Sequence, residues 1–354
     1  MPKPTSAAET RPLSPGMRVV LVTMDSHLAS AAGRAHRSLA QAVPGLSLTV
    51  HAASEWRDDP AALQRCTDDI ARGDIVLVSM LFMEDHFLPV LPALQARRDT
   101  CDAMVCLMSA TEVTRLTRMG KFDMSAPSTG PMAFLKKLRG KSSADTSTSA
   151  EEKTTAGARQ MRMLRRLPKI LRFIPGTAQD VRAYFLTMQY WLAGSEQNMF
   201  NLVQFLVDRY ADGPRRGLRG SLKPGAPLEY PEVGVYHPRM GERLSAALGD
   251  LPCVATSGKQ GTVGLLVMRS YLLAGNTGHY DGVITALEAR GLKVIPAFAT
   301  GLDNRPAIEA YFFKDGQPAI DALVSLTGFS LIGGPAYNDA HAAERLPRSA
   351  DSSG

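Results

Sequence analysis

The sequence predicts an α/β protein with two Rossmann-like (flavodoxin-like) parallel-sheet units joined by a helical segment. Three observations support this fold class. Uninterrupted apolar runs of strand length occur in residues 17–124 and again in residues 231–339, as in strands that are buried on both faces. Within each block the runs alternate with segments of helical periodicity, which favours right-handed crossovers and a parallel sheet. Residues 158–230, between the two blocks, have a mostly helical pattern.

The first unit, residues 17–124, contains four strand-like runs: MRVVLVTMD, LSLTVHAA, DIVLVSMLF and CDAMVCLMSA. The segment SHLASAAGRAHRSLAQAV predicts a helix that Ser26 caps, and DPAALQRCTDDIARG predicts a second helix that ends at Gly73. One apolar stripe of the first helix faces the core: Leu28, Ala31, Ala32, Ala35 and Leu39.

The segments around and between the two units differ in composition. Residues 1–16 are polar and rich in proline, which predicts a disordered lead without a signal core and a cytoplasmic protein. Residues 125–157 are rich in Ser, Thr, Ala and charge and predict a flexible linker. In the helical segment 158–230, one helix is expected to start at Thr177 and another to be capped by Ser195.

The second unit, residues 231–339, is expected to be an incomplete α/β domain followed by a divergent tail at 340–354. Its predicted strands are EVGVYHP, TVGLLVMRS, LKVIPAFAT and DALVSLTGFSLIG, and its predicted helices are NTGHYDGVITALEARG and NRPAIEAYFF. Ligands of open α/β sheets gather where the strands end. We therefore expect a binding edge at the carboxyl ends of these strands.

Composition excludes several classes of protein. The 354 residues are 45% apolar and no apolar run approaches a membrane helix, which needs about 20 such residues. The four cysteines form no CxxC pair and are expected to be buried thiols: Cys66, Cys101, Cys106 and Cys253. The net charge of +6 suits an anionic partner. Nucleic acid is not expected, because the basic residues gather in one segment without interleaved stacking aromatics.

Nucleotide-binding motifs fail in this chain. The segment CVATSGKQ is the nearest match to a phosphate loop, but Cys253 replaces its first glycine and Gln260 replaces the magnesium-binding Ser or Thr. No GxGxxG follows the first strand either. The sequence therefore predicts no ATP site.

Two charged segments each allow two interpretations. Glu84, Asp85 and His86 follow a strand and have the chemistry to hold a hard cation, but acids at a helix start explain them better. A basic run suits a membrane surface or an acidic partner, or is the solvated face of a helix: Arg162, Arg165, Arg166, Lys169 and Arg172. Pro168 interrupts this run and favours the solvated face.

The candidate substrate cleft is formed by residues at strand ends of the second unit. His237 follows one strand, Arg269 and Ser270 end another, and His279 and Tyr280 begin the next helix. Together they are expected to line a cleft at one sheet edge, where Arg269 meets a carboxylate. Tyr337 and Asn338 follow the last strand and join the same candidate set.

Long blocks of this sequence resemble the large, porphyrin-binding H subunit family of magnesium chelatase, which is related to the large cobaltochelatase subunit. The blocks include PEVGVYHPRM, GLLVMRSYLLAGNTGHYDGVITALEARGLKVIPAFAT, DALVSLTGFSLIGGPAYND and LRRLPKILRFIPGTAQDVRAYFLTMQYWLAGSEQNMFNLVQFLVDRYA. The resemblance covers about residues 17–339. It identifies the chain as the N-terminal third of a longer, cytoplasmic subunit.

The resemblance implies the reaction and its participants. Mg²⁺ is inserted into protoporphyrin IX on the route to chlorophyll or bacteriochlorophyll, and the AAA+ partner subunits I and D bind and hydrolyse the ATP. The family's catalytic residues are expected in the missing C-terminal part, so none is carried over and the chain alone is expected to be inactive. Two alternatives stay open, namely a cobaltochelatase subunit of cobalamin synthesis and a non-catalytic two-domain ligand-binding module.

Overall fold

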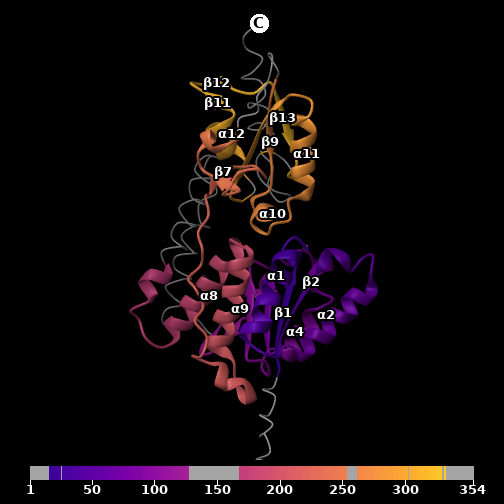
Figure 1. Ribbon diagram of the computed structural model, residues 1–354. Coiled ribbons are helices and arrows are strands. Elements are labelled where there is room, and N and C mark those ends of the chain that lie inside the picture. The colour runs from indigo at the N-terminus through magenta and orange to yellow at the C-terminus, as the bar shows by residue number, and fades with distance from the viewer. Residues whose placement is uncertain are drawn as a thin grey trace, which may run out of the picture. The chain divides into compact units, whose positions relative to one another are not determined.

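The computed structural model describes residues 16–24, 26–126, 167–252, 261–301, 303–328 and 331. The chain divides into two compact units, Met1–Leu228 and Glu229–Gly354, each with its own main β-sheet (Figure 1). The lead predicted at 1–16, the linker at 125–157 and the tail at 340–354 lie almost wholly outside the described residues. The domain boundaries drawn from the sequence therefore stay predictions.

Six strands form the sheet of the first unit, in the order β2-β1-β3-β4-β5-β6. Their bounds are β1 Met17–Thr23, β2 Leu46–Ala52, β3 Ile75–Ser79, β4 Ala103–Leu107, β5 Arg118–Met119 and β6 Phe122–Asp123. The first four strands are parallel and the last two are antiparallel. The order 2-1-3-4 is that of a flavodoxin-like sheet, whose winding reverses between β1 and β3. The predicted α/β class is confirmed.

Helices cover both faces of this sheet. They are α1 Ala29–Ala42, α2 Pro60–Arg72, α3 Glu84–Phe87, α4 Leu91–Arg97 and α5 Thr111–Thr114, with a 3₁₀ turn η1 at Ala53–Glu55. The carboxylate of Asp59 accepts a hydrogen bond from the backbone N–H of Ala61 and caps α2, which ends at Gly73 as predicted. The predicted cap at Ser26 is wrong: α1 begins at Ala29, whose N–H donates to the backbone carbonyl of Ser26.

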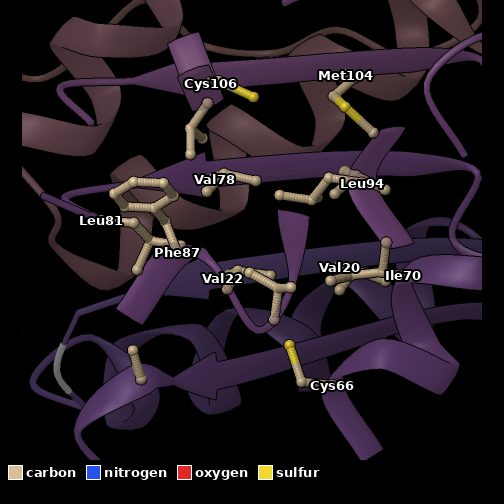
Figure 2. Close-up of a cluster of buried hydrophobic side chains, with 14 of the residues drawn as sticks. Val20, Val22, Cys66, Ile70, Val78, Leu81, Phe87, Leu94, Met104 and Cys106 are labelled. Atoms are coloured by element: carbon tan, nitrogen blue, oxygen red, sulfur yellow. The ribbon is translucent and has the colours of Figure 1, made fainter. Parts of the chain in front are cut away.

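The core of the first unit lies between the strands and the helices α2 to α5. Alternate residues of β1, β3 and β4 point to this face, among them Val20, Val78 and Met104 (Figure 2). They pack against Ile70 of α2 and Leu94 of α4, and all five side chains are buried. The opposite face receives α1, whose predicted apolar stripe is buried as expected.

The helical segment packs on the first sheet. Its helices are α8 Thr177–Leu192 and α9 Glu196–Tyr210, followed by a 3₁₀ turn η2 at Gly213–Leu218. The hydroxyl of Ser195 accepts from the N–H of Asn198 and caps α9, as predicted. Tyr184 of α8 donates through its hydroxyl to the carbonyl of Cys106 over 3.2 Å, and Arg215 pairs with Asp102 over 3.2 Å. These helices therefore belong to the first compact unit.

Five strands form the sheet of the second unit, in the order β13-β9-β10-β7-β8. Their bounds are β7 Val233–Tyr236, β8 Leu244–Ser245, β9 Thr262–Leu266, β10 Lys293–Ala299 and β13 Ala322–Ser325. Strands β13, β9 and β10 are parallel, but β7 runs antiparallel to β10 and to β8. The expectation of a wholly parallel second sheet is therefore wrong at β7, because no described helix connects β7 to β9 in the manner of a crossover.

Helices pack on both faces of the second sheet. They are α10 Arg269–Leu273, α11 Gly278–Glu288 and α12 Arg305–Tyr311, with a 3₁₀ turn η3 at Leu248–Asp250 and a small hairpin of β11 Phe313–Lys314 and β12 Gln317–Pro318. Ile284 of α11 packs against Tyr236 and Phe298 on one face. Ile308 of α12 packs against Val235 on the other face. Within the described residues, no helix combines the length and the apolar character that crossing a membrane requires.

Candidate functional site

The carboxyl edge of the second sheet is where β9, β10 and β13 end, at Leu266, Ala299 and Ser325. Because β7 is antiparallel, with Val233 opposite Ala299, it begins at this edge and ends at the other. Arg269 opens α10 directly after β9, so the structure places it at the predicted binding edge.

Arg269 holds the segment that leads into β7. Its Nε donates to the carbonyl of Pro231 over 2.7 Å, and its Nη2 donates to the carbonyl of Tyr230 over 3.1 Å. The Nε and Nη2 donors of Arg269, which we expected to bind a substrate carboxylate, are thus hydrogen-bonded to backbone carbonyls. Arg269 still brings a positive charge to this edge, and its pairing with a substrate carboxylate stays a prediction.

Three aromatic rings, from α10 and the first turn of α11, contact one another. His279, on the first turn of α11, is exposed, and its ring centroid lies 5.6 Å from that of Tyr271 and 3.8 Å from that of Tyr280. The hydroxyl of Tyr280 accepts from the N–H of Met268, and burial raises the pKa of this tyrosine. We call Tyr271, His279 and Tyr280 the aromatic cluster. Tyr271 was missed, although its position two residues after Arg269 was the available signal.

His237 lies at the opposite edge of the sheet, so its predicted placement beside Arg269 is wrong. It follows the end of β7, which points away from the carboxyl ends of the parallel strands. Its side chain is 2% exposed. Nδ1 accepts from the N–H of Arg239 over 3.2 Å, so Nε2 carries the proton that is shared with Glu288 over 3.1 Å. These contacts fasten β7 to the end of α11.

A second polar contact joins β7 to the start of α11. The hydroxyl of Tyr236 donates to Asp281 Oδ1 over 2.5 Å, and Thr277 donates to Asp281 Oδ2 over 3.0 Å. Burial and this hydrogen bond raise the pKa of Tyr236 to about 12. The hydrogen bonds of Tyr236 and His237 thus connect β7 to both ends of α11.

Asn304 is a polar group at the carboxyl edge that sequence reasoning missed. It is 3% exposed, and within the described part of the chain its Nδ2 has no hydrogen-bond partner. Its backbone N–H donates to the carbonyl of Leu331 over 3.1 Å. A buried donor without a partner is costly unless water or a ligand satisfies it. In the sequence, the only sign of this residue was its position before a predicted helix, in NRPAIEAYFF.

Tyr337 and Asn338, the last two candidates for the cleft, lie outside the described residues.

The first unit has unpaired polar groups at its own carboxyl edge. Thr23 and Ser79 end the neighbouring strands β1 and β3, lie opposite each other in register and are fully buried. Neither hydroxyl finds a hydrogen-bond partner among the described residues. Met80 follows with φ of 63°, a conformation that is unusual outside glycine. This is the point where the winding of the sheet reverses.

The other sequence candidates have structural explanations. Glu84 and Asp85 form the first turn of α3, and in the described ranges no three acidic, histidine or cysteine side chains are arranged to hold a metal. Cys66, Cys101 and Cys106 are buried and free, as predicted, and burial raises the pKa of each thiol. The segment CVATSGKQ, with Cys253, lies outside the described residues.

Comparison with known proteins gives two family matches. A domain of unknown function, DUF3479, matches residues 18–185, and the CobN/Magnesium Chelatase family matches residues 188–351. The two matches meet near the end of α8, so both compact units contribute to the second match.

Three curated relatives align with nearly the whole chain. The magnesium-chelatase H subunit of Cereibacter sphaeroides is 51% identical over 93% of this chain and 27% of its own length. The magnesium-chelatase H subunit of Rhodobacter capsulatus is 47% identical over 97% of this chain and 28% of its own length. The chloroplastic magnesium-chelatase protein ChlH of Oryza sativa subsp. japonica is 31% identical over 92% and 24%. The chain thus spans about a quarter of the length of these relatives.

One solved structure aligns weakly. The catalytic subunit of cobaltochelatase from Mycobacterium tuberculosis covers 88% of this chain and 18% of that chain, with 16% identity and a TM-score of 0.40. A score this low supports neither a fold nor a function.

Proposed function

Because the chain is homologous to the H subunit of magnesium chelatase over 93% of its length, we propose that it acts as part of the porphyrin-binding subunit of this enzyme. The proposed reaction inserts Mg²⁺ into protoporphyrin IX for the synthesis of chlorophyll or bacteriochlorophyll. The single observation that carries this proposal is the identity of 51%, which extends across both compact units.

The chemistry of the proposed reaction defines what this chain contributes. Mg²⁺ gives up its water ligands reluctantly, and the porphyrin loses two pyrrole protons to a base as the metal enters. We place the base and the ATP-driven motion in the remainder of the H subunit and in the ATPase partner subunits I and D. Mg²⁺ and the porphyrin are substrates here, and this chain is proposed to bind and orient the macrocycle.

The carboxyl edge of the second unit suits one wall of a porphyrin site. A porphyrin has a flat apolar face and two anionic propionates. The aromatic cluster offers the exposed ring of His279 and the half-buried ring of Tyr271 for stacking, and Arg269, on the same helix as Tyr271, supplies positive charge at this edge. The unpaired Nδ2 of Asn304 is a further donor at the same edge.

The relatives favour magnesium over the cobalt alternative. The CobN/Magnesium Chelatase family includes both kinds of enzyme in its name, so the match at residues 188–351 does not separate them. All three relatives described above are magnesium-chelatase subunits, from two bacteria and a plant. This observation supports the magnesium reaction as the main proposal.

Titration of the purified chain with protoporphyrin IX, followed by porphyrin fluorescence, tests the proposed wall. The double variant Tyr271→Ala/His279→Ala is expected to raise Kd about fivefold to tenfold through lost stacking. Phe82→Ala is the matched control, because Phe82 is an aromatic residue in the first unit with 54% exposure. Equal Kd values for the double variant and the control would contradict the wall, and absence of porphyrin binding by the wild-type chain would contradict binding by this part of the subunit.

A further inference from the structure

An apolar turn projects into solvent directly before α8. Leu167 and Leu171 are buried, with exposed fractions of 4% and 8%. Ile170, Phe173 and Ile174 point outward, with exposed fractions of 62%, 84% and 45%. We call these three outward residues the Phe173 knob. In Figure 1 the segment lies on the outer side of α8, away from the strands of the first sheet.

Specific contacts hold this turn in place. The side-chain amide of Gln179, on α8, donates to the carbonyls of Leu171, Arg172 and Ile174 over 2.8, 3.2 and 2.5 Å. Arg182, one turn further along α8, donates through Nε to the carbonyl of Pro168 over 3.0 Å. Residues 167–171 are helical, and these hydrogen bonds hold the exposed Phe173 in the turn that follows them.

The surroundings of the Phe173 knob carry uncompensated positive charge. Lys169 and Arg172 are exposed and have no acidic partner among the described residues. Asp180, on the first turn of α8, accepts hydrogen bonds from the N–H of Lys121 and the hydroxyl of Tyr210. Burial lowers the pKa of the Arg182 guanidinium, and the neighbouring charges of Arg209 and Arg172 lower it further.

We propose that the Phe173 knob, with Lys169 and Arg172, docks the first unit onto an anionic membrane surface. Exposed aromatic and aliphatic side chains enter the boundary between lipid headgroups and acyl chains, while flanking cations pair with lipid phosphates. The charge around the knob favours an anionic lipid over a neutral one. Two aliphatic residues and one phenylalanine on a single turn suit shallow insertion between lipids. This inference does not depend on the proposed porphyrin chemistry.

Co-sedimentation of the whole chain with vesicles tests the docking surface. Vesicles of phosphatidylcholine alone are compared with vesicles that contain equal amounts of phosphatidylcholine and phosphatidylglycerol. We expect binding to the anionic vesicles only. The double variants Phe173→Ser/Ile174→Ser and Lys169→Glu/Arg172→Glu are each expected to weaken this binding about tenfold or more, because the first removes the inserting side chains and the second replaces attraction to the lipid phosphates with repulsion.

Two matched controls separate this surface from the general basicity of the chain, whose net charge is +6. Phe82→Ser/Met83→Ser removes exposed apolar side chains elsewhere in the first unit, and Arg57→Glu reverses an exposed cation there. Both controls are expected to bind the anionic vesicles like the wild type. If the controls lose as much binding as the knob variants, the attraction is general and the proposal fails.

A tryptophan at the knob gives a second readout that does not depend on loss of binding. In Phe173→Trp, the emission is expected to shift to shorter wavelength on addition of anionic vesicles, because the ring leaves water. The native Trp56 and Trp191 are buried, with 7% and 4% exposure, and should change little. Vesicle binding without this shift, or no vesicle binding by the wild type, would overturn the proposal and indicate that a protein surface covers the knob.

Discussion

The two β-sheets of the molecule use similar apolar strands but differ in direction and in exposure. In the first sheet β3 lies between two parallel neighbours, and every residue of this strand is buried. In the second sheet the parallel strands meet an antiparallel β7 on one side, and the edge strand β13 is exposed along its whole length. The same kind of sequence run therefore gives two different environments.

The difference between the sheets shows that an apolar run predicts a buried strand but not the direction of that strand. A buried strand needs apolar residues whichever way it runs, whereas its direction depends on the connection that precedes or follows it. The parallel strands β9 and β10 are connected through α10 and α11, but no described helix makes such a connection after β7. As a consequence His237 lies at the edge opposite Arg269.

The largest effect is expected where the first sheet is most buried. Leu77→Ala in β3 removes a side chain with 0% exposure and should lower the free energy of unfolding by about 2–5 kcal/mol. Urea unfolding followed by tryptophan fluorescence measures this loss in the first unit alone, because both tryptophans, Trp56 and Trp191, belong to it.

The matched change in the second sheet is Leu323→Ala on β13, where leucine is 37% exposed. We expect its effect on unfolding, followed by circular dichroism, to stay within about 0.5 kcal/mol, as for other surface substitutions. A loss as large as that of Leu77→Ala would show that β13 is covered and would remove the contrast between the sheets.

An intermediate effect is expected at the antiparallel strand itself. In Gly234→Ala, the added Cβ would lie 2.6 Å from the ring of Phe298 and 2.6 Å from the backbone carbonyl oxygen of Ser245. Because the β8 backbone cannot easily move, the second unit should lose about 1–3 kcal/mol of stability. Thermal unfolding followed by circular dichroism measures the change.

Gly282→Ala is the control for that substitution. Gly282 lies in α11 with open space around its would-be Cβ, so alanine should stabilise the helix by up to about 1 kcal/mol. The two Gly→Ala changes in one unit are thus expected to have opposite signs. A neutral Gly234→Ala would mean that β7 and β8 are not packed as closely as described.

The sequence predicted most elements of the fold because periodicity and end signals are local. Gly73 ends α2 and Ser195 caps α9, as their positions along the chain indicated. Ser26 was a misleading signal, because a backbone carbonyl replaced its side chain at the start of α1. Either a side chain or a backbone carbonyl can accept the first N–H groups of a helix, and the sequence alone does not show which of the two does so.

The candidate site was less predictable, since it depends on which strand ends meet. Arg269 and His279 lie at the carboxyl edge because both fall between the parallel strands β9 and β10, and their role in a binding site stays a prediction. Tyr271 and Asn304 were missed, because a tyrosine on a short helix and an asparagine before a helix are common without any function. Only the ring contacts of Tyr271 and the unpaired amide of Asn304 distinguish them.

A smaller effect than that of Gly234→Ala is expected at the hydrogen bond that ties β7 to α11. Tyr236→Phe removes the donor to Asp281 and should cost about 1 kcal/mol at neutral pH, because Thr277 still donates to the same carboxylate. Burial raises the pKa of Tyr236 to about 12, whereas an unfolded tyrosine titrates near about 10. The protonated hydroxyl therefore contributes its full stability below about pH 10, and this contribution is lost as the pH rises toward 12. Urea unfolding of the second unit at a series of pH values should show the wild type and Tyr236→Phe converging above pH 10. Other buried tyrosines titrate in both proteins and cancel in the difference.

The contradicting outcome is a stability difference between wild type and Tyr236→Phe that stays constant from pH 10 to 12. It would mean that the Tyr236 phenol titrates alike in the folded unit and in the unfolded chain, and that its hydrogen bond to Asp281 does not hold the antiparallel strand.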